Sequence, residues 1–187
     1  MVERISALIG HYQFGHFGKE EQVGVVLSEL PNLSLIQVAA WPENFQELSF
    51  QLAKSYGIKN APEKGKCAAI GDIALLHVEP LKWWCYGPLA PLEIPIETGA
   101  SLDISHSRAH VRLSGTEAHV CLNRLISVDL RSSACPVGSI VSTSLHHVGV
   151  TIWHSKDGYE LFVPRGFAID LWDILKATAE QFGLDIA

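Results

Sequence analysis

A proline-rich stretch near the middle of the chain limits what this sequence can fold into. Residues 88–98 read PLAPLEIPIET and place three prolines within eight residues. Proline has no backbone N–H to donate to a strand ladder, so the stretch is unsuited to a central strand. We therefore predict a connector here, with a domain boundary near Glu97.

The residues before the connector predict a small α+β domain over residues 31–97. Residues 33–41 (LSLIQVAAW) form an alternating apolar run that is typical of a strand. A helical pattern with Gly57 as its stop follows, and residues 67–88 supply two or three short strands. The order β-α-β-β predicts a helix over an antiparallel sheet, in a ferredoxin-like arrangement. Residues 1–30 show little periodicity and are expected to form an extended arm with one strand.

The residues after the connector predict a second α+β domain over residues 98–187. Residues 101–115 predict one or two strands, and Ser114 with Glu117 matches the S-x-x-E capping box of a helix start. A hairpin is expected over residues 138–155, a further strand begins at an Asp-Gly turn, and an amphipathic helix closes the chain. The predicted fold class is therefore α+β, with two small layers of antiparallel sheet and packed helices.

Charge and cysteine usage exclude several classes of protein. The net charge is −6 with no block of lysine or arginine, so no nucleic-acid partner is predicted. No apolar run is long enough to span a bilayer, so no membrane partner is predicted, and the N-terminus lacks the cleavage site of a signal peptide. The four cysteines form no CxxC pair, which favours neither a zinc site nor a disulfide framework. We expect a cytoplasmic chain with reduced thiols.

A cluster of polar residues between residues 99 and 120 raises the question of catalysis. On a strand, residues of the same parity share a face, so His106 and Arg108 would point one way and Asp103 and Ser105 the other. The Ser105 hydroxyl and the His106 imidazole could not then form a nucleophilic triad, and the chain has no G-x-S-x-G elbow. No catalytic residue is predicted; the four side chains are assigned to a structural strand or to a contact with a partner.

The sequence contains few patterns that are typical of a metal or cofactor site. His106 and His110 could form one edge of a metal site with His146 and His147, but no acidic partner stands at a recognisable spacing. Lys66 could lower the pKa of the Cys67 thiol, although a buried strand cysteine is the favoured interpretation. No glycine loop matches GxGxxG or the P-loop. We therefore predict no metal and no cofactor in this chain.

Two adjacent tryptophans, Trp83 and Trp84, leave two alternatives open. Neighbouring strand residues face opposite sides, so one ring could lie in the core while the other is an exposed interface anchor. Both could equally belong to the core. A composition of 48% apolar and 18% charged residues also favours a surface that is partly covered by a partner.

The sequence resembles a known family, most strongly in its second half. Residues 102–130 and 135–183 resemble the gamma subunit of heterotetrameric sarcosine oxidase, and the likeness extends over most of the chain from about Leu30. The motifs that carry it are DISHSR, LSG, PVG, VPRGF and LWD, at residues 103–108, 113–115, 136–138, 163–167 and 171–173.

The second half is also similar, more distantly, to the folate-binding T-protein (aminomethyltransferase) of glycine cleavage. This resemblance implies a T-protein-like, folate-binding-like fold for the C-terminal part. A later stretch of the T-protein carries an aspartate for folate chemistry, whereas here Gly149 is kept and Thr151, Ile152 and Trp153 stand where carboxylates would be needed. Without that base, the resemblance implies a folate-type fold that lacks its site.

The gamma-subunit resemblance implies one of four subunits, alpha, beta, gamma and delta. Such a complex oxidatively demethylates sarcosine to glycine, forms hydrogen peroxide and passes a one-carbon unit to tetrahydrofolate. FAD, FMN, NAD and tetrahydrofolate are then expected in alpha and beta, and zinc in delta. This chain would be a non-catalytic structural subunit that contacts mainly alpha, through the N-terminal arm, Trp83 or Trp84, and the exposed side of the strand at residues 103–110.

Other functions remain open. The chain could be the gamma subunit of a sister complex that acts on another N-methyl amino acid. It could also be a stand-alone folate-binding or aminomethyltransferase-like protein, in which Asp157 or Asp129 would have to supply the missing carboxylate. A third class, T-protein relatives that assist iron–sulfur assembly, carries a KGC motif after the folate-like fold, whereas KGKC here lies before it, so that match is judged accidental.

Overall fold

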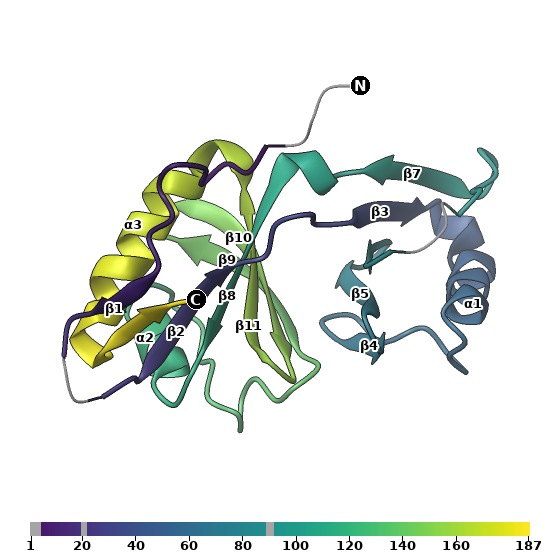
Figure 1. Ribbon diagram of the computed structural model, residues 1–187. Coiled ribbons are helices and arrows are strands. Elements are labelled where there is room, and N and C mark those ends of the chain that lie inside the picture. The colour runs from purple at the N-terminus through teal and green to yellow at the C-terminus, as the bar shows by residue number, and fades with distance from the viewer. Residues whose placement is uncertain (1–4, 20–21, 89–91) are drawn as a thin grey trace. The chain divides into compact units, whose positions relative to one another are not determined.

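The computed structural model describes residues 5–19, 22–88 and 92–187, which divide into two compact units (Figure 1). The seven-stranded unit contains the described residues up to Asn32 together with His106–Val137 and Val141–Ala187. The five-stranded unit contains Leu33–Ser105 together with Gly138–Ile140. Each sheet is mainly antiparallel and is accompanied by few helices, which confirms the predicted α+β class. Within the described residues, no helix is both long and apolar enough to cross a membrane.

The five-stranded sheet is antiparallel throughout, in the order β4-β5-β6-β3-β7. Its strands are β3 (Leu35–Ala40), β4 (Cys67–Ile70), β5 (Ile73–Glu79), β6 (Lys82–Tyr86) and β7 (Gly99–Asp103). After β3, the 3-10 turn η1 (Pro42–Asn44) leads into α1 (Phe45–Ser55). Leu48 and Leu52 of this helix pack into one buried cluster with Val38 and Trp83 of the sheet. The predicted stop is confirmed, since Gly57 follows the helix with a φ of +65° that favours glycine.

The seven-stranded sheet runs in the order β1-β12-β2-β8-β11-β10-β9, with β12 and β2 as its parallel pair. Its strands are β1 (Gly15–Phe17), β2 (Val25–Glu29), β8 (Arg108–Ser114), β9 (Ile140–Leu145), β10 (Val148–Ser155), β11 (Gly158–Pro164) and β12 (Leu184–Ile186). Two helices, α2 (Ala118–Asn123) and α3 (Ala168–Ala179), cover one face, and the turn η3 (Arg165–Phe167) precedes α3. Leu171, Trp172 and Leu175 of α3 recur at helical spacing and share one buried cluster with Val111 and Leu161 of the sheet.

The N-terminal residues are integrated into the seven-stranded unit. Leu8 is fully buried, and the ring of Tyr12 lies 5.0 Å from that of Trp172 in α3. Further along, β1 pairs with β12 and β2 pairs with both β12 and β8. The expectation of an arm with a single strand is therefore too simple, because two short strands join the sheet. Residues 1–4 and 20–21 of the predicted arm lie outside the described residues.

The unit boundaries also differ from the predicted domains 1–30, 31–97 and 98–187. The strand that follows the prolines, β7, pairs with β3 in the register Ile36↔Asp103, so it completes the five-stranded sheet. The division consequently falls between Ser105 and His106 rather than near Glu97. Local strand patterns do not encode which sheet a strand joins. Residues 89–91 of the predicted connector lie outside the described residues.

The predicted capping box at Ser114 is wrong. Ser114 is the last residue of β8 and pairs with Val26 of β2, while the helix α2 begins at Ala118 with Glu117 as its N-cap and without a side-chain cap. Gly115 has a φ of +106°, and a Cβ there would lie 2.4 Å from the carbonyl oxygen of Gly24. The chain turns tightly against β2 at this glycine, which moves the helix start beyond the reach of Ser114.

Candidate functional site

The predicted polar cluster is divided by a tight turn. β7 ends at Asp103, the 3-10 turn η2 (Ser105–Ser107) follows, and β8 starts at Arg108, so no continuous strand places these side chains on two faces. Ser105 is buried; its Oγ accepts the backbone N–H of Leu35 at 2.8 Å. The backbone N–H of Ser105 in turn donates to Asp103 Oδ1 at 2.8 Å. The side chains of Asp103 and Ser105 therefore stabilise the backbone around this turn. His106, by contrast, is exposed.

Trp83 and Trp84 both lie in the interior. Trp83 is fully buried and stacks between Phe45 and His77, with ring centroids at 5.1 and 4.8 Å. Trp84, on the opposite face of β6, is only 6% exposed, and its Nε1 donates to Gln37 Oε1 at 3.3 Å. Of the two alternatives, the core position is therefore confirmed for both rings, and the prediction that one of them is an exposed interface anchor is wrong.

A buried carboxylate that the sequence did not bring forward lies on the sheet face opposite α3. Glu160 of β11 stands directly across from Arg112 of β8, and its side chain is 1% exposed. Its Oε1 accepts hydrogen bonds from Arg112 Nε at 2.7 Å and from Ser155 Oγ at 2.8 Å, and its Oε2 accepts one from His110 Nε2 at 2.8 Å. We call these four side chains the Glu160 cluster.

The electrostatics of the Glu160 cluster favour a structural role. Burial alone would raise the pKa of Glu160, but the hydrogen bonds from His110 and Ser155 and the charge of Arg112 outweigh it and lower the pKa. A carboxylate whose oxygens are occupied in this way is held ionised and is unavailable as a general base. The sequence signal for this buried carboxylate was a single charged residue within the otherwise apolar run YELFV.

Asp129 and Asp157, the two aspartates that could have supplied a carboxylate for folate chemistry, also lie beside arginines. Asp129 Oδ2 lies 2.6 Å from Arg131 Nη2, and the side-chain hydrogen bonds from this arginine lower the pKa of Asp129 to about 2. Such an acid is a weak base at neutral pH. Asp157, in the turn between β10 and β11, has Oδ2 3.9 Å from Arg112 Nη2.

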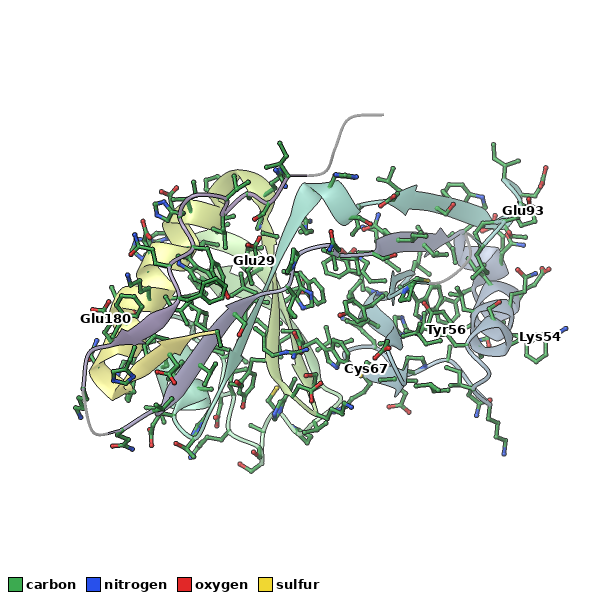
Figure 2. All side chains as sticks on the ribbon, in the orientation of Figure 1. Glu29, Lys54, Tyr56, Cys67, Glu93 and Glu180 are labelled. Carbon is green, nitrogen blue, oxygen red and sulfur yellow. The ribbon has the colours of Figure 1, made fainter. Side chains whose placement is uncertain are left out.

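The thiols offer no activated nucleophile. Cys67, on β4 (Figure 2), is half-buried, and the neighbouring Lys66 directs its Nζ to Ser139 Oγ at 3.0 Å. Cys85, Cys121 and Cys135 are buried free cysteines. Burial raises the pKa of the Cys121 thiol to about 12, which keeps it protonated and unreactive.

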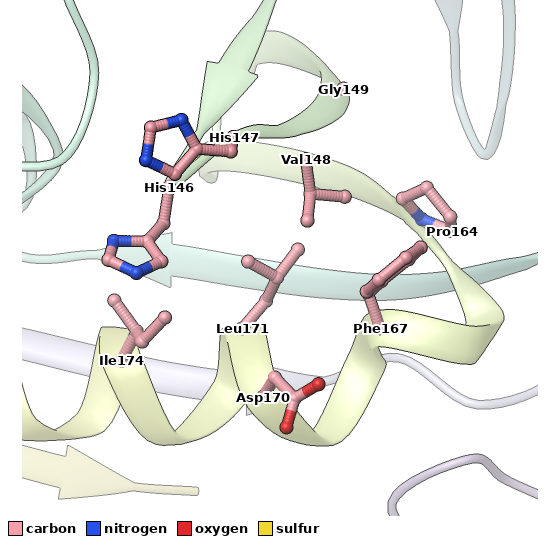
Figure 3. A pocket seen from close by; sticks show the side chains of 9 residues that line it. All are labelled: His146, His147, Val148, Gly149, Pro164, Phe167, Asp170, Leu171 and Ile174. Carbon is pink, nitrogen blue, oxygen red and sulfur yellow. The ribbon is translucent and has the colours of Figure 1, made fainter.

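A surface pocket of about 660 Å³ lies between the β9–β10 turn and the start of α3 (Figure 3). From the turn, residues 146–149 line it. From the other side come Pro164, Phe167, Asp170, Leu171 and Ile174. We call this site the hairpin pocket. Its volume lies within the range of small-molecule and anchor-residue sites.

The histidines do not assemble a metal site. His146 and His147 occupy the hairpin turn with ring centroids 5.4 Å apart, whereas His110 is bound to Glu160. Among residues 5–19, 22–88 and 92–187, no group of three or more His, Cys, Asp or Glu side chains could hold a metal ion. The metal site considered from the sequence is therefore not formed by its four histidines, His106, His110, His146 and His147.

Comparison with known proteins identifies the chain's relatives. Residues 97–180 match the model of the sarcosine oxidase, gamma subunit family. The matched region extends from just before β7 to just past α3 and contains the DISHSR, VPRGF and LWD motifs, so the predicted resemblance is confirmed. No curated protein matches the chain significantly.

Solved structures extend the likeness to the whole fold. A chain of the heterotetrameric sarcosine oxidase from Corynebacterium sp. U-96, in complex with pyrrole 2-carboxylate, matches with a TM-score of 0.74 at 20% identity, over 98% of this chain and 99% of that chain. The aminomethyltransferase T of the glycine cleavage system from Bartonella henselae matches with a TM-score of 0.57 at 13% identity, over 89% of this chain and 48% of that chain. This chain thus spans about half the transferase. At these identities the likeness shows a shared fold, as the T-protein resemblance implied.

Proposed function

We propose that the chain is the gamma subunit of a heterotetrameric sarcosine oxidase complex, which oxidatively demethylates sarcosine to glycine and feeds a one-carbon unit to tetrahydrofolate. One observation carries this proposal. The region that matches the gamma-subunit family model lies within a fold that corresponds from end to end to a chain of such a complex. By contrast, the chain covers about half of the aminomethyltransferase it resembles, which disfavours a stand-alone transferase.

The chain's own part in this proposal is structural. We propose that FAD, FMN, NAD and tetrahydrofolate bind in the alpha and beta subunits and zinc in delta, and that the complex is cytoplasmic. The residues support a non-catalytic role because each candidate base or nucleophile is engaged: Glu160 by three donors, Asp129 by Arg131, and Ser105 by the backbone of Leu35. Exposed side chains such as Ile9 at 70% and Phe14 at 77% support a surface that a partner covers.

Co-expression tests the proposal. The chain is produced with the genes for candidate alpha, beta and delta subunits, and the purified material is measured by size exclusion with light scattering. We expect the chain to co-elute with flavin absorbance at one copy per complex. Sarcosine is then compared with other N-methyl amino acids as substrates, because preference for another amine would identify a sister complex.

The same material distinguishes the alternative. The chain alone is titrated with tetrahydrofolate in a calorimeter, and the Asp129→Asn and Asp157→Asn variants are the matched controls. A monomer that binds tetrahydrofolate and ignores the flavoprotein subunits would overturn the subunit proposal and favour a folate-binding protein.

A further inference from the structure

The hairpin pocket has an apolar wall beside a single acid. Val148, Leu171 and Ile174 face it from two elements, and Asp170 stands at its edge on the first turn of α3 (Figure 3). Asp170 is exposed, and within the described residues it has no ion-pair partner. An apolar recess with a free carboxylate at its rim complements an apolar group that carries a positive charge beside it.

The turn at the rim is held against its local backbone preference. His146 and His147 form a two-residue hairpin loop with φ of 45° and 73°. Such loops favour Asn-Gly, because residues with a Cβ are disfavoured at positive φ by about 1 kcal/mol or more. Both imidazoles are exposed, so burial in the chain does not offset this cost. Residues held in strained backbone conformations of this kind cluster at active sites and ligand-binding sites.

The pocket has an exposed apolar margin, as a protein interface does. Phe167 lines the pocket and is 49% exposed. Arg165 Nη2 donates to the carbonyl oxygen of Ile5 at 2.6 Å, and this bond holds a second exposed apolar residue, Ile5 at 52%, near the turn that precedes α3. A small ligand would be mostly enclosed by its site, whereas an apolar centre with a polar rim and open apolar margins is the anatomy of a protein contact.

We propose that the hairpin pocket receives an apolar anchor side chain, flanked by a lysine or arginine, from another subunit of the complex. This inference rests on the proposed function and adds the surface through which the chain is held. The anchor packs on Val148, Leu171 and Ile174, and the neighbouring cation pairs with Asp170. Anchors of this type carry a large share of the binding energy of an interface.

Two variants test the pocket within the co-expressed complex. Ile174→Trp fills the recess from α3, and Asp170→Lys reverses the charge at its rim. Each is expected to weaken retention of the chain by about tenfold or more in dissociation constant, measured by biolayer interferometry against the complex assembled without it. Gln46→Trp adds the same ring at an exposed position of α1, and Glu47→Lys reverses an acid in the first turn of α1; both are expected to bind like wild type.

Folding and assembly are separated by measuring the free variants. Asp170 is exposed, so Asp170→Lys is expected to unfold within a few degrees of wild type, and this variant alone keeps the test valid if Ile174→Trp fails to fold. A photo-crosslinker in place of Phe167 is expected to capture a peptide of another subunit that contains a lysine or arginine.

The outcomes are distinct. Unchanged retention of both pocket variants, or a crosslinked peptide without a basic residue, overturns the pocket proposal and leaves the subunit proposal standing. A small molecule seen on the free chain by native mass spectrometry and lost in Ile174→Trp, with assembly unchanged, also overturns it. Failure of the wild-type chain to join any complex overturns the proposed function itself.

Discussion

Glu160 shows how a single residue connects two neighbouring strands of the seven-stranded unit. It accepts hydrogen bonds from His110 and Arg112 of β8 and from Ser155 of β10, while its side chain is 1% exposed. Hydrogen bonds to a buried ionised group are worth about 1.5–3 kcal/mol each, and removing the charge leaves the donors without an equivalent acceptor. The carboxylate therefore contributes to stability rather than to chemistry.

We expect Glu160→Gln to lower the free energy of unfolding by about 2 kcal/mol at pH 7, because an amide offers one acceptor atom where the carboxylate offers two. Urea unfolding followed by tryptophan fluorescence measures this change. Glu79→Gln is the matched control: Glu79 is exposed and pairs with Lys82 at 2.8 Å, so its loss is expected to change stability by less than about 0.5 kcal/mol. Equal effects of the two substitutions would contradict the assigned role.

The pH dependence of stability follows from the lowered pKa of Glu160. Its pKa in the folded chain lies below its ordinary value of 4.5, so the stabilisation is complete above that value and is lost as the pH falls through the folded pKa. We expect the stability difference between wild type and Glu160→Gln to be constant from pH 7 to about pH 5 and to shrink in more acidic buffer. Unfolding curves at each pH measure it, and a difference that grows with acidity would show the opposite sign of shift.

At the scale of elements, the hairpin β9–β10 combines a predictable turn position with unexpected turn residues. The sequence predicts a hairpin that turns near His146, and the strands do end at Leu145 and resume at Val148. The positive φ angles of His146 and His147 could not be read from their residue types, because histidine gives no turn signal comparable to Asn-Gly. The strained turn lies at the rim of the hairpin pocket, where we propose that another subunit binds.

Replacing both turn residues, His146→Asn with His147→Gly, is expected to raise the stability of the free chain by about 1 kcal/mol. Differential scanning calorimetry measures this as a higher Tm. The same dipeptide in the β10–β11 turn, Lys156→Asn with Asp157→Gly, is the control, since neither residue there has a positive φ and no gain is expected. A gain in the control and none at residues 146–147 would show that the strain lies elsewhere.

At the scale of the whole molecule, the sequence predicted the individual helices, strands and turns better than it predicted which strands pair with one another. The helix after β3 and the buried stripe of α3 follow from local periodicity, and the Asp-Gly turn before β11 follows from its residue types. The pairing of β7 with β3 and of β1 with β12 joins segments that are far apart in the chain, and period-2 patterns carry no information on such partners. The Glu160 cluster escaped prediction for the same reason, since its members come from β8, β10 and β11.

The two ends of the chain meet in one sheet, and this arrangement can be tested. β12 lies between β1 and β2, so β1 has β12 as its neighbour in the described sheet. A chain that ends at Gly183 removes β12 and Ala187, and with them the pairings Gly15↔Ile186, His16↔Asp185 and Phe17↔Leu184 and the hydrogen bond from the Tyr12 hydroxyl to the Ala187 carbonyl.

In this truncated chain we expect residues 15–17 to exchange their amide hydrogens at the rate of free peptide, while β8 and β11 stay protected, because their ladder contains no residue of β12. Hydrogen exchange with mass spectrometry measures both regions in one experiment. Asp185→Asn is the control: it removes the charge opposite His16, 2.6 Å away, and keeps the backbone ladder, so residues 15–17 are expected to stay protected. Continued protection of residues 15–17 after truncation would mean that side-chain contacts such as Lys176 over Phe17, at 4.0 Å, and not the ladder, hold this segment in place.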